Sequence, residues 1–154
     1  MTEDDASFVY TLFNSPKWLQ YIGDREIRSV DDAKAYIKEN IMPSYTEMGF
    51  GFYKMCLKEN GQTIGICGIV KRDYLDHVDI GYAILPQFEG KGYTSEAAKA
   101  MLEHGKYTLK LHPILAITAK DNLASQQLLN KIGLKKVGLI TTTVHPDKIV
   151  LFST

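Results

Sequence analysis

The chain has 154 residues and a mass of 17.3 kDa, a size that predicts one domain over residues 1–154. Hydrophobic residues make up 45% of it and charged residues 23%, which excludes global disorder because this apolar content suffices for a core. The 18 basic and 18 acidic side chains cancel, so we expect neither nucleic acid nor an anionic membrane as a partner, although a local basic patch stays open.

The longest apolar run, Ile64–Val70, has the length of a strand and is too short to span a bilayer. The first residues, Met1–Asp5, are acidic and unlike a secretory signal, so we expect a cytoplasmic protein. Cys56 and Cys67 lie in apolar segments, which predicts two core thiols. No cluster of His, Cys, Asp or Glu has the spacing of metal ligands, so we expect no metal.

The first third of the chain has helical periodicity. Apolar residues of Ala6–Phe13 repeat at three- and four-residue intervals, and Asn14–Pro16 ends this predicted helix. A second helix opens at Ser29, and its apolar stripe runs to Ile41, shortly before a proline near its end, Pro43. In the connection between them, Trp18 and Tyr21 either line a pocket or cover the core.

The middle of the chain predicts strands. Phe50–Lys58 and Thr63–Lys71 flank an Asn60-Gly61 pair, which predicts a hairpin with a type I′ turn. His77–Leu85 alternates apolar and small or polar residues, as in a third strand.

The second half changes period after Pro86. A glycine-rich loop leads into a predicted helix over Tyr93–His104, and Ile114–Thr118 forms the next strand, so this part predicts a parallel βαβ unit. A last helix begins at Asp121 or Asn122 and ends before Gly133, and a hairpin of Leu134–Thr143 and Lys148–Phe152 closes the chain. The residues expected to face inward on these two helices are Ala97, Ala100 and Met101, and Ala124, Leu128 and Ile132. The order of elements predicts an α/β (α+β) layered domain with a mixed sheet.

The loop between the third strand and its helix has the pattern Gln87-x-x-Gly90-x-Gly92. Glycines let backbone N–H groups approach a ligand, and the first turn of the helix adds unpaired donors, which together with Lys91 suit a phosphate. The spacing matches neither a Rossmann fingerprint, in which Ser95 would be a glycine, nor a Walker A loop. An anion site and a plain tight turn therefore both remain open.

Two motifs resemble those of the GNAT acetyltransferase superfamily. Asp79–Ala97 resembles its acyl-CoA motif, and Asn122-x-x-Ser125 with the segment to Leu134 resembles its second cofactor motif. The resemblance is to the Rim-like branch, typified by ribosomal-protein N-terminal acetyltransferases. It implies a mixed, mostly antiparallel sheet with a βαβ unit and helices on both faces. The family normally begins with a strand, whereas Met1 falls almost on the first predicted helix, so either the chain is truncated or this strand is missing or replaced. A sheet edge left open in this way invites pairing with another chain.

The resemblance also implies a role for each motif residue. Backbone groups of Ile84 and Leu85 would bind the pantetheine arm of acetyl-CoA, and Asn122 and Ser125 would flank its distal end and thioester. The pyrophosphate would lie on Gln87, Gly90, Lys91, Gly92, Tyr93 and Thr94.

The implied reaction is direct attack of a primary amine on the thioester of acetyl-CoA. Asp79 is the candidate base, and the alternative is a structural ion pair with Arg72 or Lys71. Ser125 either hydrogen-bonds the thiol as a weak acid or is a surface serine. Many relatives carry a tyrosine acid where this chain has Leu129.

We therefore expect an acetyl-CoA-dependent N-acetyltransferase acting on a protein N-terminus or a small-molecule amine, as a monomer or homodimer. The alternatives are a non-catalytic acyl-CoA-binding module and, last, a nucleotide-binding regulatory domain. Acceptor specificity is expected in three segments, Asn14–Asp24, Met42–Gly49 and Thr141–Lys148.

Overall fold

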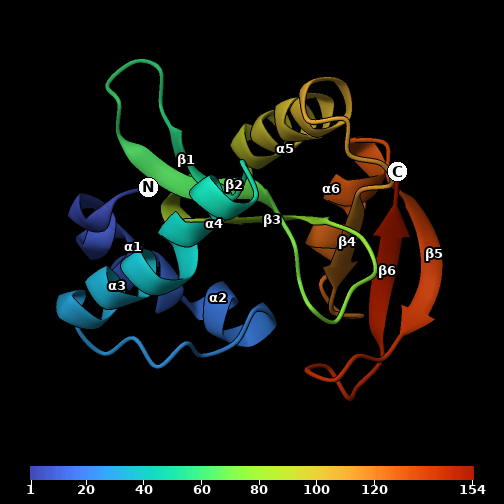
Figure 1. Cartoon of the computed structure of the whole chain (residues 1–154), viewed down its shortest axis with the longest axis horizontal. Coiled ribbons are helices and arrows are strands. Elements are labelled where there is room, and N and C mark those ends of the chain that lie inside the picture. Colours follow the sequence, from blue (N-terminus) through green and yellow to red (C-terminus); the bar gives the residue numbers. More distant parts are fainter. The chain divides into compact units, whose positions relative to one another are not determined.

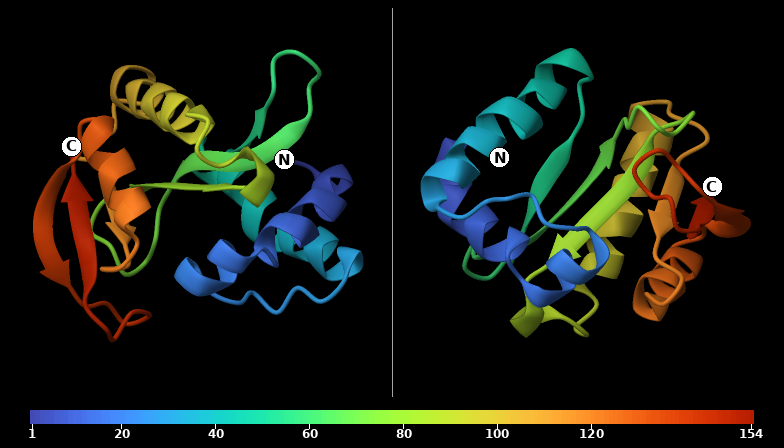
Figure 2. Two further views of the ribbon diagram at one scale, coloured as in Figure 1. Left: turned by 180° about the vertical axis from the view of Figure 1, so that it is seen from behind. Right: turned by 90° about the horizontal axis from the view of Figure 1, so that it is seen from below.

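The computed structural model describes residues 1–154 and contains a six-stranded sheet in the order β1-β2-β3-β4-β6-β5 (Figures 1 and 2). The strands are β1 (Phe52–Cys56), β2 (Thr63–Val70), β3 (Asp79–Ile84), β4 (Leu115–Thr118), β5 (Lys135–Ile140) and β6 (Ile149–Ser153). The helices are α1 (Ala6–Phe13), α2 (Pro16–Tyr21), α3 (Val30–Tyr36), α4 (Met42–Glu47), α5 (Tyr93–Glu103) and α6 (Leu123–Lys131). The predicted mixed α/β fold is confirmed.

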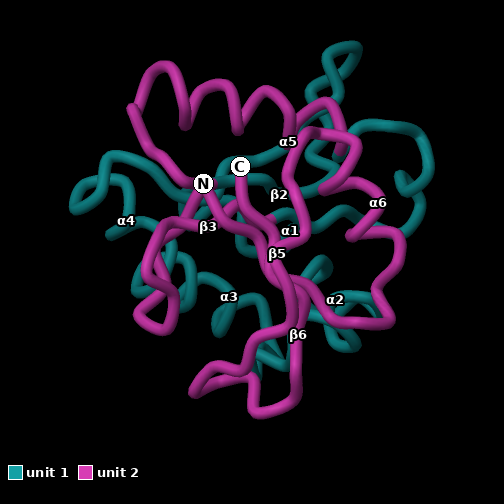
Figure 3. The backbone as a smooth tube through the Cα atoms, turned by 90° about the vertical axis from the view of Figure 1, so that its right-hand side faces the viewer, with its two compact units in different colours: residues 1–68, 82–94 teal, residues 69–81, 95–154 magenta.

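The chain divides into two compact units (Figure 3). The first comprises Met1–Gly68 and Tyr82–Thr94, and the second comprises Ile69–Gly81 and Ser95–Thr154. The boundaries fall inside β2, β3 and α5, so these three elements each contribute residues to both units.

Helix α1 starts where the sequence predicts. The Asp5 carboxylate accepts a hydrogen bond from the Thr2 N–H at 2.9 Å just ahead of it, and the helix ends at Phe13. Pro16 then begins α2, which the sequence pattern does not predict, because six residues are too few to show a periodicity. Proline is favoured at a first helical position, since its missing N–H would have no intrahelical partner there.

Helix α3 begins at the predicted cap. The Ser29 hydroxyl accepts a hydrogen bond from the Asp32 N–H at 3.0 Å, and the Asp32 carboxylate accepts one from the Arg28 N–H at 3.0 Å. A π-helical turn over Ile37–Ile41 then leads directly into α4. The expectation that the helix ends near Pro43 is wrong, because α4 takes this proline into its first turn and continues to Glu47.

The β1–β2 hairpin is confirmed, but its turn is not of type I′. Only Gly61 of the Asn-Gly pair has a left-handed φ, +73°. The turn closes through hydrogen bonds from the Leu57 N–H to the Gln62 carbonyl at 2.9 Å and from the Gly61 N–H to the Leu57 carbonyl at 2.8 Å. The Asn60 side-chain oxygen accepts from the Gln62 N–H at 3.0 Å, which stabilises this longer loop.

The core of the first unit lies between its helices and the strands β2 and β3. Trp18 is 6% exposed and stacks on Phe13, with ring centroids 3.7 Å apart. Of the two expectations for Trp18, covering the core therefore holds, whereas Tyr21 is half-buried. The buried members of this core are Ala6, Val9, Leu12, Phe13, Trp18, Ile27, Ala33, Ile37, Ile41, Ile66 and Leu85.

In the second unit, β3 pairs with β4 in parallel at Asp79 and Leu115, as the predicted βαβ unit requires. Helix α5 continues into a π-helical turn over His104–Thr108. A Cβ atom on Gly105 would lie 2.4 Å from Ile69 and 2.7 Å from Ile114, so the helical backbone approaches these side chains closely.

This close approach sets which face of α5 is buried. The buried side chains are Ala98 and Leu102, which lie seven and three residues before Gly105. The expected stripe is therefore wrong at Ala100, which is exposed, whereas Ala97 and Met101 are half-buried beside the true stripe.

Helix α6 is capped by Asn122 rather than Asp121, and its side-chain oxygen accepts from the Ser125 N–H at 3.2 Å. At its other end Gly133 has φ +103°, as predicted. The Leu134 N–H donates to the Leu129 carbonyl at 3.0 Å, and the Gly133 N–H to the Asn130 carbonyl at 3.1 Å, which is a Schellman motif.

The buried face of α6 is centred on Leu129, so the expected stripe is wrong by one residue. Ala124 is exposed, and Leu128 and Ile132 are half-buried. A leucine in this position contributes packing where many relatives are expected to carry a tyrosine.

Strands β5 and β6 form the predicted closing hairpin, and the described chain has no strand before β1, so β1 and β5 are the outer strands. None of the helices combines the length and hydrophobicity that crossing a membrane requires. Of the two expected core thiols, Cys67 is buried and Cys56 is exposed, because successive side chains of β1 point to opposite faces and the neighbouring Met55 is the buried one.

Candidate functional site

The end of β3 leads into the glycine-rich loop within the first unit. The Leu85 N–H donates to the Ile64 carbonyl at 2.8 Å, which holds the end of β3 to β2. A short 3-10 turn over Pro86–Phe88 follows, and then Gly90 and Gly92 take left-handed φ values of +73° and +87°. A Cβ atom on either glycine would meet nothing within 4 Å, so conformation and not space requires glycine at both positions.

The first turn of α5 follows directly after Gly92 and carries Tyr93 and Thr94, both half-buried. Its first backbone N–H groups have no partner within the helix, and the helix dipole places partial positive charge at the same end. Two left-handed glycines ahead of this helix end form a backbone arrangement suited to an anion. Gln87 is exposed at the start of the loop.

Charged side chains surround the loop. The ammonium group of Lys91 lies 5.6 Å from the centre of the Phe88 ring, a cation–π distance. Lys17 of α2 forms an ion pair with Glu89, the residue just before Gly90. Because 72 residues separate these two, no local sequence pattern predicts their contact.

The second motif forms the start of α6, in the second unit. The Asn122 side chain caps the helix through the Ser125 N–H, so its oxygen already has a structural partner. Asn122 and Ser125 are both half-buried. The predicted contacts from Ile84 to Thr94 thus belong to the first unit, whereas Asp79, Asn122 and Ser125 belong to the second.

Asp79 is buried at the first position of β3, with 1% of its surface exposed. The Arg72 Nε–H donates to both carboxylate oxygens, at 2.9 and 3.0 Å, and an Nη1–H of Arg72 donates to the Tyr74 hydroxyl at 3.1 Å. Burial raises the pKa of the Asp79 carboxyl, and the Arg72 guanidinium opposes that shift. Of the expected ion-pair partners Arg72 is the one in contact, since the Lys71 ammonium donates to the Leu75 carbonyl.

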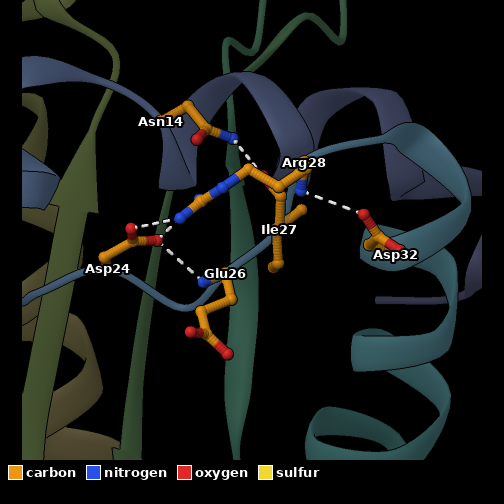
Figure 4. A network of polar contacts seen from close by, with 6 residues as sticks. All are labelled: Asn14, Asp24, Glu26, Ile27, Arg28 and Asp32. Carbon is orange, nitrogen blue, oxygen red and sulfur yellow. Dashed lines mark hydrogen bonds and ion pairs between the residues drawn. The ribbon is translucent and has the colours of Figure 1, made fainter.

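The connection between α2 and α3 extends beyond the expected acceptor segment Asn14–Asp24 and is fixed by polar contacts (Figure 4). Arg28 pairs with both oxygens of Asp24, and Asp24 accepts from the Glu26 N–H at 2.7 Å. The Asn14 amide donates to the Ile27 carbonyl at 3.0 Å, which ties the connection to the end of α1. This connection therefore has a defined backbone path.

Comparison with known proteins gives concordant matches. A profile described as "Acetyltransferase (GNAT) domain" matches residues 1–135. The uncharacterized N-acetyltransferase YnaD of Bacillus subtilis (strain 168) is 28% identical over 134 residues, which cover 87% of this chain and 75% of the relative.

Two solved structures share the fold. The ribosomal-protein-S5-alanine acetyltransferase from Vibrio fischeri is similar with a TM-score of 0.82 and 17% identity, covering 100% of this chain and 89% of the other. The aminoglycoside acetyltransferase AAC(6')-Ib in complex with coenzyme A is similar with a TM-score of 0.80 and 19% identity, covering 100% and 91%. Because the profile spans most of the chain and agrees with the fold, the chain belongs to the GNAT family of acetyltransferases and is an acyltransferase.

Proposed function

We propose that the chain transfers the acetyl group of acetyl-CoA to a primary amine, either a protein N-terminus or a small-molecule amine. The observation that carries the proposal is the pair of left-handed glycines, Gly90 and Gly92, placed directly before the first turn of α5. Their left-handed φ requires glycine, and the lack of side chains at both positions leaves the loop backbone open to a ligand.

The acetyl-CoA contacts proposed for the first unit follow the order of the chain. The backbone of Ile84 and Leu85 would hold the pantetheine arm by strand-like hydrogen bonds. The N–H groups of Gly90–Thr94 and the charge of Lys91 would hold the pyrophosphate, and Gln87 would donate its side-chain amide. In the second unit, Asn122 and Ser125 would contact the distal pantetheine and thioester.

The acceptor classes are proposed from chemistry and from relatives. Of the two similar solved enzymes, one is named for the alanine of ribosomal protein S5 as its acceptor, and the other is named for aminoglycosides. An α-amino group with a pKa of ~7.7–8.0 is neutral far more often at pH 7 than a lysine-like amine with a pKa of ~10.4. A lysine-like acceptor would therefore depend more on a base or a desolvating pocket.

Bound acetyl-CoA supplies an activated thioester, and the chain's own groups position it. Ser125 is proposed to hydrogen-bond the thiol sulfur. Asp79 stays a candidate for accepting the proton of the amine. To do so, its carboxylate would have to exchange a hydrogen bond from Arg72, which donates to both of its oxygens.

Thermal unfolding with acetyl-CoA, CoA and ATP tests the cofactor assignment. A ligand at about 100 times its dissociation constant adds ~2.7 kcal/mol to the free energy of unfolding. We expect a rise in Tm with both CoA species and none with ATP. A rise with ATP alone would favour the nucleotide-binding alternative, and no rise with any ligand would contradict the proposal.

The variant Gly92→Ala tests the loop itself. Alanine in a left-handed conformation costs about 1–2 kcal/mol, so the loop should change its path and lose most of the Tm rise with CoA. Gly61→Ala is the matched control, because Gly61 has a similar left-handed φ of +73° but lies in the hairpin turn, outside the loop. Gly61→Ala should lower the Tm of the free protein and keep the rise with CoA.

Release of the CoA thiol in the presence of an amine panel separates the enzyme from a non-catalytic acyl-CoA-binding module. The panel contains peptides with free N-termini, aminoglycosides and polyamines. Thiol release above the rate of hydrolysis with at least one amine is expected. CoA binding without transfer to any of these amines would favour the binding module.

A further inference from the structure

The ion pair between Lys17 and Glu89 joins α2 to the glycine-rich loop of the same unit. Glu89 immediately precedes Gly90, so its carboxylate is placed at the start of the segment proposed to bind the pyrophosphate. A carboxylate there repels a phosphate ligand unless a cation compensates its charge.

The packing of α2 fixes the backbone from which the Lys17 side chain extends. Its neighbour Trp18 is buried and stacks on Phe13, in the same core that contains Leu85 and that Phe88 packs against. One core therefore supports the backbone of both partners of the ion pair, Lys17 from α2 and Glu89 from the loop.

The cation nearest in sequence, Lys91, does not serve this purpose. Its ammonium group lies over the Phe88 ring, and the structure pairs Glu89 with Lys17. The Lys91 ammonium group therefore forms no ion pair with Glu89 and can interact with a bound anion, while Lys17 compensates the negative charge of Glu89.

We propose that Lys17 is a positioning residue for acetyl-CoA, acting through Glu89: it neutralises this carboxylate and thereby lets the loop accept the phosphates of the cosubstrate. The inference rests on the proposed function, because it assigns a task to α2 at the same phosphate site. Lys17 itself makes no contact with the phosphates in this arrangement.

Isothermal titration of CoA and of pantetheine, which lacks the phosphates, tests the inference on four proteins. These are the wild type, Lys17→Met, Glu89→Gln and the double variant. Lys17→Met should weaken CoA binding about fivefold, a factor equal to ~1 kcal/mol, and leave pantetheine binding unchanged. Glu89→Gln should bind CoA at least as tightly as the wild type, and the double variant should match Glu89→Gln.

Lys34→Met is the matched control for loss of a surface ion pair. Lys34 pairs with Glu3 at 3.6 Å, and its side chain is 55% exposed, compared with 58% for Lys17. This control should bind CoA as the wild type does. The effect of Lys17→Met should also shrink at high salt, because the Debye length falls to about 3 Å at 1 M.

The outcomes separate this inference from the proposed function. A double variant as weak as Lys17→Met would mean that Lys17 contacts the phosphates directly, and would overturn the inference. If the wild type binds CoA and Lys17→Met binds it with the same affinity, the inference is overturned too, while the proposed function stays intact. A wild type that fails to bind CoA would overturn both.

Discussion

Asp79 is the residue at which structural and chemical explanations compete most directly. Its carboxylate is buried, and Arg72, with a side chain that is 26% exposed, donates to both oxygens. A buried pair of this kind is costly to break, because the remaining charge is left without compensation. A general base, in contrast, needs an oxygen that can receive a proton from the amine.

The variants Arg72→Met and Asp79→Asn separate these two roles. If Arg72 and Asp79 act only as an ion pair, each variant should lose ~3–5 kcal/mol in the free energy of unfolding, and activity should follow the folded fraction. If Asp79 is the general base, Asp79→Asn should also abolish the acidic limb of the pH profile of kcat/KM, whereas Arg72→Met should keep it. Chemical unfolding and a pH–rate profile on each variant provide the measurements, and a limb that survives in folded Asp79→Asn would rule out the base.

The lowered pKa of Asp24 leads us to expect a defined dependence of the free energy of unfolding on pH. The Arg28 guanidinium and the Glu26 N–H hydrogen-bond its carboxylate and lower its pKa to about 2 (Figure 4). The unfolded value is ~3.9, so the unfolded state binds more protons between these two values, and this contribution to stability is lost as the pH falls from ~4 to about 2.

Carboxyl chemical shifts followed by NMR through an acid titration measure this effect. Arg28→Met should move the pKa of Asp24 upward toward ~3.9, and Arg25→Met, which removes a guanidinium that makes no ion pair, should leave it near its wild-type value. An unchanged Asp24 pKa in Arg28→Met would contradict the role given to the ion pair.

At the scale of elements, the start of α6 combines a structural cap with a proposed contact to acetyl-CoA. Asn122→Ala removes the cap and should cost ~1 kcal/mol in the free energy of unfolding. Asn122→Asp keeps an oxygen for the Ser125 N–H and should keep the stability, yet it loses the amide donor. If that donor contacts acetyl-CoA, both variants bind CoA more weakly.

Ser29→Ala is the control, because it removes the equivalent cap of α3. It should lower stability by a similar ~1 kcal/mol. CoA titration and urea unfolding of the three variants measure the two effects separately. Wild-type affinity in Asn122→Asp would show that Asn122 acts only as a cap.

The prolines show why element boundaries are harder to predict than element types. Pro16 and Pro43 both lie in the first turn of a helix, α2 and α4, although a proline after a helical pattern usually indicates an end. The π-helical turn over Ile37–Ile41, which leads into α4, has no local sequence pattern that predicts it. Whether a proline ends one helix or begins the next depends on whether the following turn packs against the core, and this packing is a tertiary property.

At the scale of the whole molecule, the two compact units share β2, β3 and α5. Because unfolding either unit would disrupt strands of the other, we predict one cooperative transition for residues 1–154. The chain has a single tryptophan, Trp18, whose fluorescence reports on the first unit, whereas far-UV circular dichroism reports on both. Urea unfolding curves from the two probes should coincide, and separate midpoints would indicate two independent domains.

The mixed α/β fold, the βαβ unit and the glycine-rich loop could be predicted from the sequence, because periodicity, helix caps and glycine positions are local properties. Ser29, Gly61 and Gly133 each act through neighbours a few residues away. The contacts between distant segments could not be predicted in this way and became visible only in the folded chain. Gly105 sets the buried face of α5 through Ile69 and Ile114, and Lys17 meets Glu89 because α2 and the loop share one core, an outcome that depends on how side-chain volumes fit.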